Sequence, residues 1–249
     1  MQSFKELVRN QLLLLTFREF KPNLRDHWRA YLGWGLFWTW VAGMGRYWDN
    51  PKAEWWQTLG LGSLAYIFVL ALVLWLLILP LRPKNWSYRN ILIFLSLTAL
   101  PAVLYAIPVE RFMPLREAQS ANAWFLAIVA TWRVALLWFF LTRVAQLRGF
   151  AIFVACLLPL TLIVTALTML NLEHVVFNIM AGNTPTDQSG NDGAYFVLAI
   201  LTFFSFFALW PLLAGYIVLI INAWQKPKKE AAGADAVEAK PGDGADSVP

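Results

Sequence analysis

Six long apolar segments, separated by short polar or charged connections, dominate the pattern of hydrophobic positions along the chain. A helix needs about 20 apolar residues, each rising about 1.5 Å, to cross the hydrocarbon core of a bilayer. The pattern therefore predicts an all-α fold, a polytopic transmembrane helix bundle of about six spans that fills residues 30–225. The expected spans are 30–47, 58–81, 90–109, 121–144, 150–172 and 194–224.

The first and third of these segments depart from the simple pattern. Only 16 residues separate Arg29 from Arg46, so the first span is short, and we expect both arginines to extend toward the headgroups. Its small residues recur every four positions, which favours close packing of a neighbouring helix against Gly35, Thr39 and Gly43. In the third span, Pro101 predicts a kink.

The two flanks of the bundle differ from it in composition. Residues 1–29 predict a cytoplasmic amphipathic arm, whose helix either lies in the membrane interface or docks on the bundle. Its basic side chains can reach lipid phosphates. Residues 226–249 begin with lysines and continue as Ala, Gly, Asp and Glu, so we expect a disordered cytoplasmic tail.

Composition places the chain in the membrane class. It is 59% hydrophobic and 14% charged, whereas a soluble domain has about a quarter of its residues charged. The net charge of +5 does not indicate nucleic-acid binding, because the basic residues stand at the ends of apolar runs.

The distribution of Lys and Arg predicts the orientation. Six spans put fifteen of these residues on one side and four on the other, so both termini are expected in the cytoplasm of a bacterial-type inner or plasma membrane. Without the first span the tally is ten against nine and the bias disappears.

No motif for enzyme or cofactor chemistry stands out. The single cysteine, Cys156, excludes an intrachain disulfide, and one Cys with two His at unrelated positions gives no metal-ligand spacing. Signatures of metalloproteases, serine hydrolases and nucleotide-binding loops are missing from the sequence. We therefore expect no cofactor and no metal.

Arg133, near the middle of the fourth span, is the residue on which the functional interpretation depends. A charge at the bilayer centre costs from about 3 to over 10 kcal/mol, so it needs a partner, a hydrated cavity or a route to the interface. We expect the other helices to pack around this span and to satisfy Arg133. Glu173 and Glu110 are the carboxylates favoured as partners.

Other ionisable residues follow the spans that end on the expected outer side. Asp49, Glu54 and Glu117 are interpreted as solvated charges. The remaining ones, together with Arg133, are candidates for binding a substrate or a lipid headgroup. They are Arg46, Glu110, Arg111, Glu173 and His174.

The leading functional hypothesis is a non-enzymatic membrane subunit or scaffold that acts through lipids, a membrane-protein partner or a second copy of itself. A second hypothesis is a transporter or channel that uses Arg133 for an anionic substrate. A third is a membrane enzyme acting on lipid, with Glu173 and His174 as acid/base groups.

Overall fold

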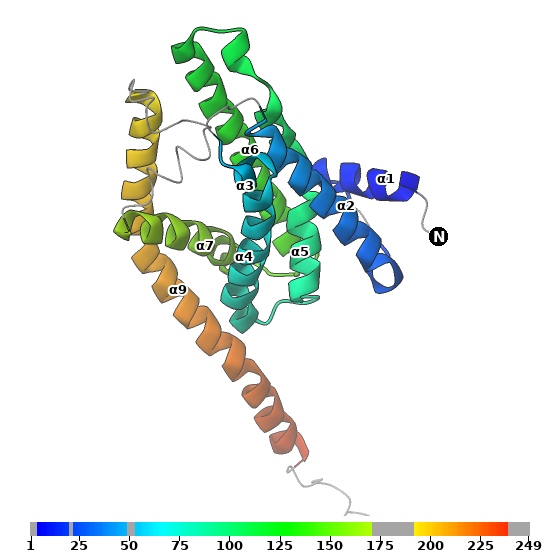
Figure 1. Ribbon diagram of the computed structural model, residues 1–249. Helices are drawn as coiled ribbons and strands as arrows, with labels where there is room; N and C mark the ends of the chain where they lie inside the picture. Colours follow the sequence, from blue (N-terminus) through cyan, green and yellow to red (C-terminus); the bar gives the residue numbers. More distant parts are fainter. Residues whose placement is uncertain (1–3, 20–21, 49–52, 171–191, 239–249) are drawn as a thin grey trace, which may run out of the picture.

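The computed structural model describes residues 4–19, 22–48, 53–170 and 192–238, with the backbone alone at 110, 115–116, 119, 192–198 and 226–238. The described part is helical, with no strand (Figure 1). Its elements are α1 (Phe4–Leu15), α2 (Leu24–Gly45), α3 (Trp55–Thr58), α4 (Leu61–Ile78), η1 (Leu79–Leu81), α5 (Tyr88–Leu97), η2 (Leu100–Ala106), η3 (Val109–Arg111), α6 (Leu115–Arg143), α7 (Phe150–Met169) and α9 (Asp192–Glu238).

Four helical segments are long and apolar enough to cross a membrane: Leu61–Leu81, Ser120–Arg143, Phe150–Met169 and Ala199–Gln225. A fifth arises if α5 and η2, which are bent by 42° at a short break, form one span. The expected class of helical membrane protein is supported. The count of six stays a prediction, because α2 begins in a charged stretch and its charge-free part, 30–45, has only 16 residues.

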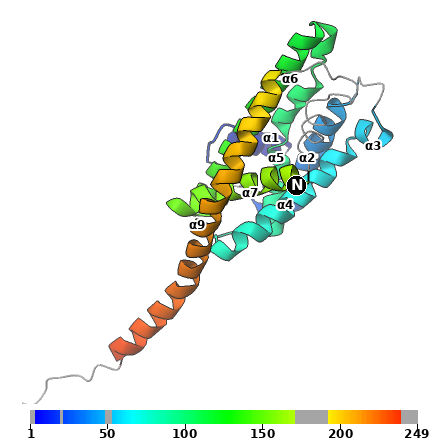
Figure 2. The ribbon, with the colours of Figure 1, turned by 90° about the vertical axis from the view of Figure 1, so that its left-hand side faces the viewer.

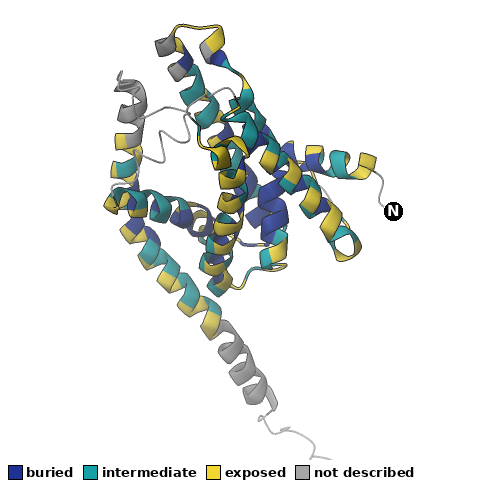
Figure 3. Ribbon diagram, in the orientation of Figure 1, coloured by how far each residue is buried: buried dark blue, intermediate teal, exposed yellow. Residues whose placement is uncertain are grey.

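The most enclosed element is α5. Its residues from Ile91 to Leu97 are all buried, against α2 and α4 and the second half of α6 (Figure 3). The Phe94 and Phe140 rings stack with centroids 4.2 Å apart, which joins α5 to α6. Our expectation that the helices pack around the Arg133 helix is therefore corrected, because the centre of the bundle is α5.

The break between α5 and η2 is explained by Pro101. Proline has no N–H to donate to the carbonyl four residues earlier, and its ring clashes with that carbonyl, so the expected kink is confirmed. The carbonyl in question belongs to Leu97. The buried side chain of Gln11 donates its Nε2 to this oxygen at 3.0 Å. Its Oε1 in turn accepts from Trp34 Nε1 at 2.8 Å.

This contact shows how the N-terminal helix α1 sits. Gln11, Leu14 and Leu15 are buried against the bundle, and Trp132 Nε1 donates to the Leu15 carbonyl at 3.0 Å. The opposite side of α1 is exposed, with Phe4 among its exposed residues. The structure thus favours the docked arrangement for α1, and contact of its outer side with lipid stays a prediction.

The last two helices form a second layer. In both views α7 lies crosswise to α4 and α9, while α9 extends well past one end of the bundle (Figures 1 and 2). Buried Val154, Leu158, Leu209 and Leu212 join α7 to α9. The helix α9 continues to Glu238, past the expected start of the tail at residue 226. Residues 239–249 lie outside the described part, and a disordered tail stays a prediction.

Candidate functional site

Arg133 lies in the middle of α6 and is half-buried. Its Nη2 atom is buried and has no hydrogen-bond partner among the described residues. A guanidinium N–H removed from water without an acceptor carries the full cost of desolvation, which is larger for a charged group than for a neutral one. Arg133 is therefore a half-buried cation with one unsatisfied nitrogen, and the partner that the sequence led us to expect is not found among the described residues.

A second arginine has a similarly unpartnered nitrogen. Arg46 is the C-cap residue that follows α2, and its Nε is also buried without a partner among the described residues. Its guanidinium carbon lies 4.7 Å from the centroid of the Tyr105 ring, a cation–π contact. The Tyr47 side chain hydrogen-bonds to the same guanidinium.

Tyr105 brings the two arginines into one site. It lies on η2, and both Arg46 and Arg133 interact electrostatically with its phenol, as does Tyr66 of α4. Arg46 contacts this ring directly, and Arg133 of α6 acts on the phenol through its charge. We call Arg46, Tyr105 and Arg133 the paired-arginine site.

The close approach of α2 and η2 fixes one side of the paired-arginine site. A Cβ built on Gly45 would lie 2.6 Å from the Cβ of Ala106, so a larger residue at position 45 would force the two elements apart. Trp48 Nε1 also donates to the Ala106 carbonyl at 3.0 Å. The end of α2 is therefore held against the end of η2, one residue beyond Tyr105.

The other wall of the site is apolar. Ala42, Ala102 and Val129 form a small buried cluster, against which Tyr105 packs. Val129 precedes Arg133 by one turn of α6, so this apolar cluster and the arginine share a face of the helix. Apolar surroundings lower the local dielectric and strengthen any interaction between a guanidinium and an anion.

The carboxylates with described side chains are all exposed, whereas the unpartnered nitrogens of the two arginines are buried. Each of these carboxylates belongs to a helix end or a connection: Glu6, Glu19, Asp26, Glu54 and Glu117. The structure does not describe the side chains of the two carboxylates that we predicted as partners of Arg133. Glu110 belongs to η3, but its side chain is not described, and Glu173 lies outside the described residues, as does His174. Their pairing with Arg133 stays a prediction.

The sixth candidate, Arg111, is separate from the site. Its guanidinium carbon lies 4.9 Å from the centroid of the Trp48 ring, and its side chain is exposed. Arg111 thus flanks the paired-arginine site on the side of η3 and provides a natural control for it.

The small-residue stripe of α2 lies at two close helix contacts. A Cβ on Gly35 would lie 2.3 Å from Ser96 Oγ of α5, and one on Gly43 would lie 2.8 Å from Ser63 of α4. Thr39 between them is buried and donates its hydroxyl to the Gly35 carbonyl at 2.9 Å. The stripe therefore determines how closely α2 approaches α5 and α4.

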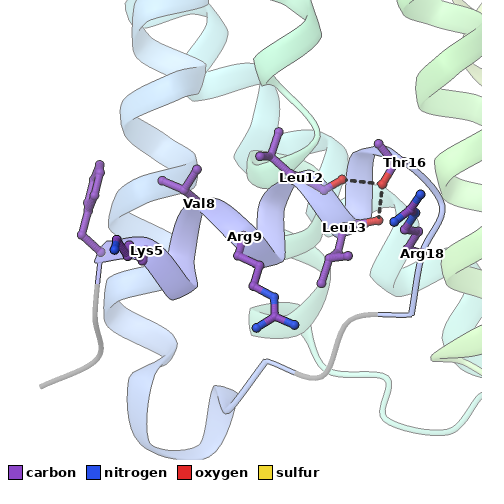
Figure 4. A pocket seen from close by; sticks show the side chains of 8 residues that line it. Lys5, Val8, Arg9, Leu12, Leu13, Thr16 and Arg18 are labelled. Atoms are coloured by element: carbon purple, nitrogen blue, oxygen red, sulfur yellow. Dashed lines mark hydrogen bonds between the residues drawn. The ribbon is translucent and has the colours of Figure 1, made fainter.

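The outer face of α1 forms a second basic surface. Figure 4 shows Lys5, Arg9 and Arg18 beside Val8 and Leu12 along a groove of about 650 Å³. The groove is lined by this one helix and the turn that follows it. It is a wide, open surface of mixed apolar and cationic character, suited to lipid contact rather than to enclosing a ligand.

Sequence reasoning missed Tyr105 as a site residue. Tyr105 is not among the site residues predicted above, and no local pattern distinguishes it from the other aromatic residues of the chain. The signal that could have found it is the proximity of Pro101, since broken membrane helices often carry binding sites.

The described residues contain no group of three or more His, Cys, Asp or Glu side chains that could hold a metal ion. The chain matches no protein-family model, no curated protein and no solved structure.

Proposed function

We propose that this protein is a non-enzymatic membrane component that binds an anionic group between Arg46 and Arg133. The observation that carries the proposal is a buried guanidinium nitrogen without a described partner on each of two arginines whose charges both act on Tyr105. The anion is a phosphate or a carboxylate, because both present oxygen acceptors in a geometry that guanidinium groups bind well.

Energetics supports an anion in this place. Two cations interacting with one phenol in apolar surroundings repel each other, and each has a nitrogen without an acceptor. A hydrogen bond to a charged group contributes about 1.5–3 kcal/mol. One anion that accepts from both arginines offsets their repulsion and satisfies both nitrogens. We favour the headgroup of an anionic membrane lipid, since lipid surrounds the protein.

A transporter for an anionic solute is the second candidate, and one observation favours it. Tyr105 belongs to the broken span α5–η2, and transporters place their substrate sites at discontinuous helices. For a lipid-modifying enzyme using Glu173 and His174, no described residue adds support.

The test uses protein purified in an uncharged detergent as wild type, Arg46→Gln, Arg133→Gln and the control Arg111→Gln. Native mass spectrometry measures retained phosphatidylglycerol and phosphatidylcholine. We expect each site variant to lose at least tenfold in phosphatidylglycerol affinity, from about 1.5 kcal/mol per lost contact, with Arg111→Gln close to wild type. Equal binding by all four proteins would contradict the proposal.

Two further measurements separate the alternatives. Uptake of an anionic solute into proteoliposomes that depends on Arg133 would identify transport. A double-mutant cycle between Arg133→Ala and Glu173→Gln tests the structural account, in which a protein carboxylate takes the place of the anion. Strong non-additivity in thermal stability, without added lipid, would show that Glu173, and not a bound anion, is the partner of Arg133.

A further inference from the structure

A cavity of about 460 Å³ opens at the end of the bundle where α2 begins and α6 ends. Its walls come from the residues just before α2, the connection between η1 and α5, α5 itself and the last turn of α6. The volume is within the range of ligand-binding sites. Along α6, Arg143 is ten residues from Arg133, about 15 Å, so this cavity is separate from the paired-arginine site.

The mouth of the cavity is cationic and polar. Arg25 and Arg143 both line it, and both side chains are exposed. Asn85 also lines it, and its Nδ2 donates to the Val144 carbonyl at 3.5 Å. The connection that carries Asn85 is tied to the end of α6 by a second bond, from the Lys84 N–H to the Ala145 carbonyl at 2.9 Å. Two hydrogen bonds therefore hold the connection that carries Asn85 against the end of α6.

The floor of the cavity is apolar. Ile93, Phe94, Leu97 and Phe140 all line it, and all are buried, with exposed fractions of 1–4%. The stacked rings of Phe94 and Phe140 make this surface rigid. A cationic mouth above an apolar floor matches a molecule with an anionic head and a hydrocarbon tail.

We propose that this cavity binds an anionic phospholipid, with its phosphate between Arg25 and Arg143 and the start of an acyl chain on the phenylalanine floor. The described carboxylate nearest in sequence, Asp26, accepts a hydrogen bond from Asn23 at 3.0 Å. Basic cavities between membrane helices on the cytoplasmic side are a known means of recognising lipid headgroups. A free phosphate ion uses the same mouth but gains nothing from the floor, so the two sources differ in affinity.

The experiment compares wild type with two double variants that remove the same charge. Arg25→Gln/Arg143→Gln empties the mouth, whereas Arg29→Gln/Arg89→Gln removes two arginines that lie over Trp28, at 5.4 and 5.5 Å, outside the cavity lining. A third variant, Val144→Phe, fills part of the cavity without changing charge. Each protein, in an uncharged detergent, is titrated with phosphatidylglycerol, phosphatidylcholine and inorganic phosphate, and bound ligand is counted by native mass spectrometry.

We expect Arg25→Gln/Arg143→Gln to weaken phosphatidylglycerol binding at least tenfold, from about fivefold per cation. The Arg29/Arg89 control should bind within twofold of wild type, and Val144→Phe should weaken phosphatidylglycerol but leave phosphate unchanged. Equal losses in the two double variants would show diffuse attraction and overturn the proposal. Phosphate bound as tightly as phosphatidylglycerol would overturn the assignment to a lipid. Because Arg46 and Arg133 are intact in every variant, the lipid proposed to bind there is retained, and the loss expected here is that of a second bound phosphatidylglycerol.

Discussion

Replacing Gln11 by methionine tests whether α1 is part of the folded bundle rather than an appendage. Methionine keeps the size and flexibility of the side chain but removes both of its hydrogen bonds, to the Leu97 carbonyl at 3.0 Å and from Trp34 Nε1 at 2.8 Å. Gln11 is only 2% exposed, so water does not replace these bonds in the folded protein. The variant leaves a buried acceptor next to the break in the central helix.

The two lost bonds do not contribute equally. An unsatisfied buried polar group costs about 1–3 kcal/mol, and Leu97 is 1% exposed with a proline where the usual donor would be. Trp34 is half-buried, so its N–H is closer to solvent and its loss costs less. Hydrogen bonds between membrane helices average only about 0.6 kcal/mol, which limits the total. We expect Gln11→Met to destabilise by about 2–3 kcal/mol and Trp34→Phe by about 1 kcal/mol.

The assay is thermal unfolding in a mild uncharged detergent. For a chain of this length, about 2–3 kcal/mol lowers Tm by roughly 4–12 °C. The exposed Gln225 provides the control, because Gln225→Met changes an exposed position and should stay within about 0.5 kcal/mol. In a Pro101→Ala background, residue 101 regains an N–H for the Leu97 carbonyl, so Gln11→Met should cost less. A Gln11→Met melting curve that matches the control would refute the reasoning.

The close contact of α2 predicts that Gly35→Ala destabilises by about 1–3 kcal/mol, because its Cβ would lie 2.3 Å from Ser96 Oγ. Gly33→Ala, with no atom within 4 Å of its Cβ, should instead stabilise by about 0.5–1 kcal/mol; equal melting temperatures would contradict this. Topology is tested by reporter fusions, which should be outside after Trp48 and cytoplasmic after Lys84. A cytoplasmic reporter after Trp48 would show that α2 does not span the membrane, and the predicted Lys and Arg bias between the two sides would then disappear.

The sequence was sufficient to predict the class of fold because membrane helices are marked by long apolar runs. The segments around α4, α6, α7 and α9 were recognised on length and hydropathy alone, and the kink at Pro101 followed from local stereochemistry. These features depend on nearby residues, and so a single sequence reveals them.

The centre of the bundle could not be predicted in the same way. The sequence of α5 does not mark it as the centre, because its burial depends on which helices surround it. Gln11 has no distinguishing feature in the sequence, since its partner Leu97 is 86 residues away. Likewise, the sequence singled out Arg133 by its charge, but the approach of Tyr105 and Arg46 depends on tertiary packing.

The central claim is that Arg46 and Arg133 bind one anion together, and a double-mutant cycle on phosphatidylglycerol affinity tests it most directly. The affinities of wild type, Arg46→Gln, Arg133→Gln and the double variant give the coupling energy between the two arginines. If both contact the same anion, removing the first weakens the contribution of the second, and we expect a coupling above about 1 kcal/mol. Losses that add within about 0.5 kcal/mol would show that the two arginines do not share a ligand and would contradict the account.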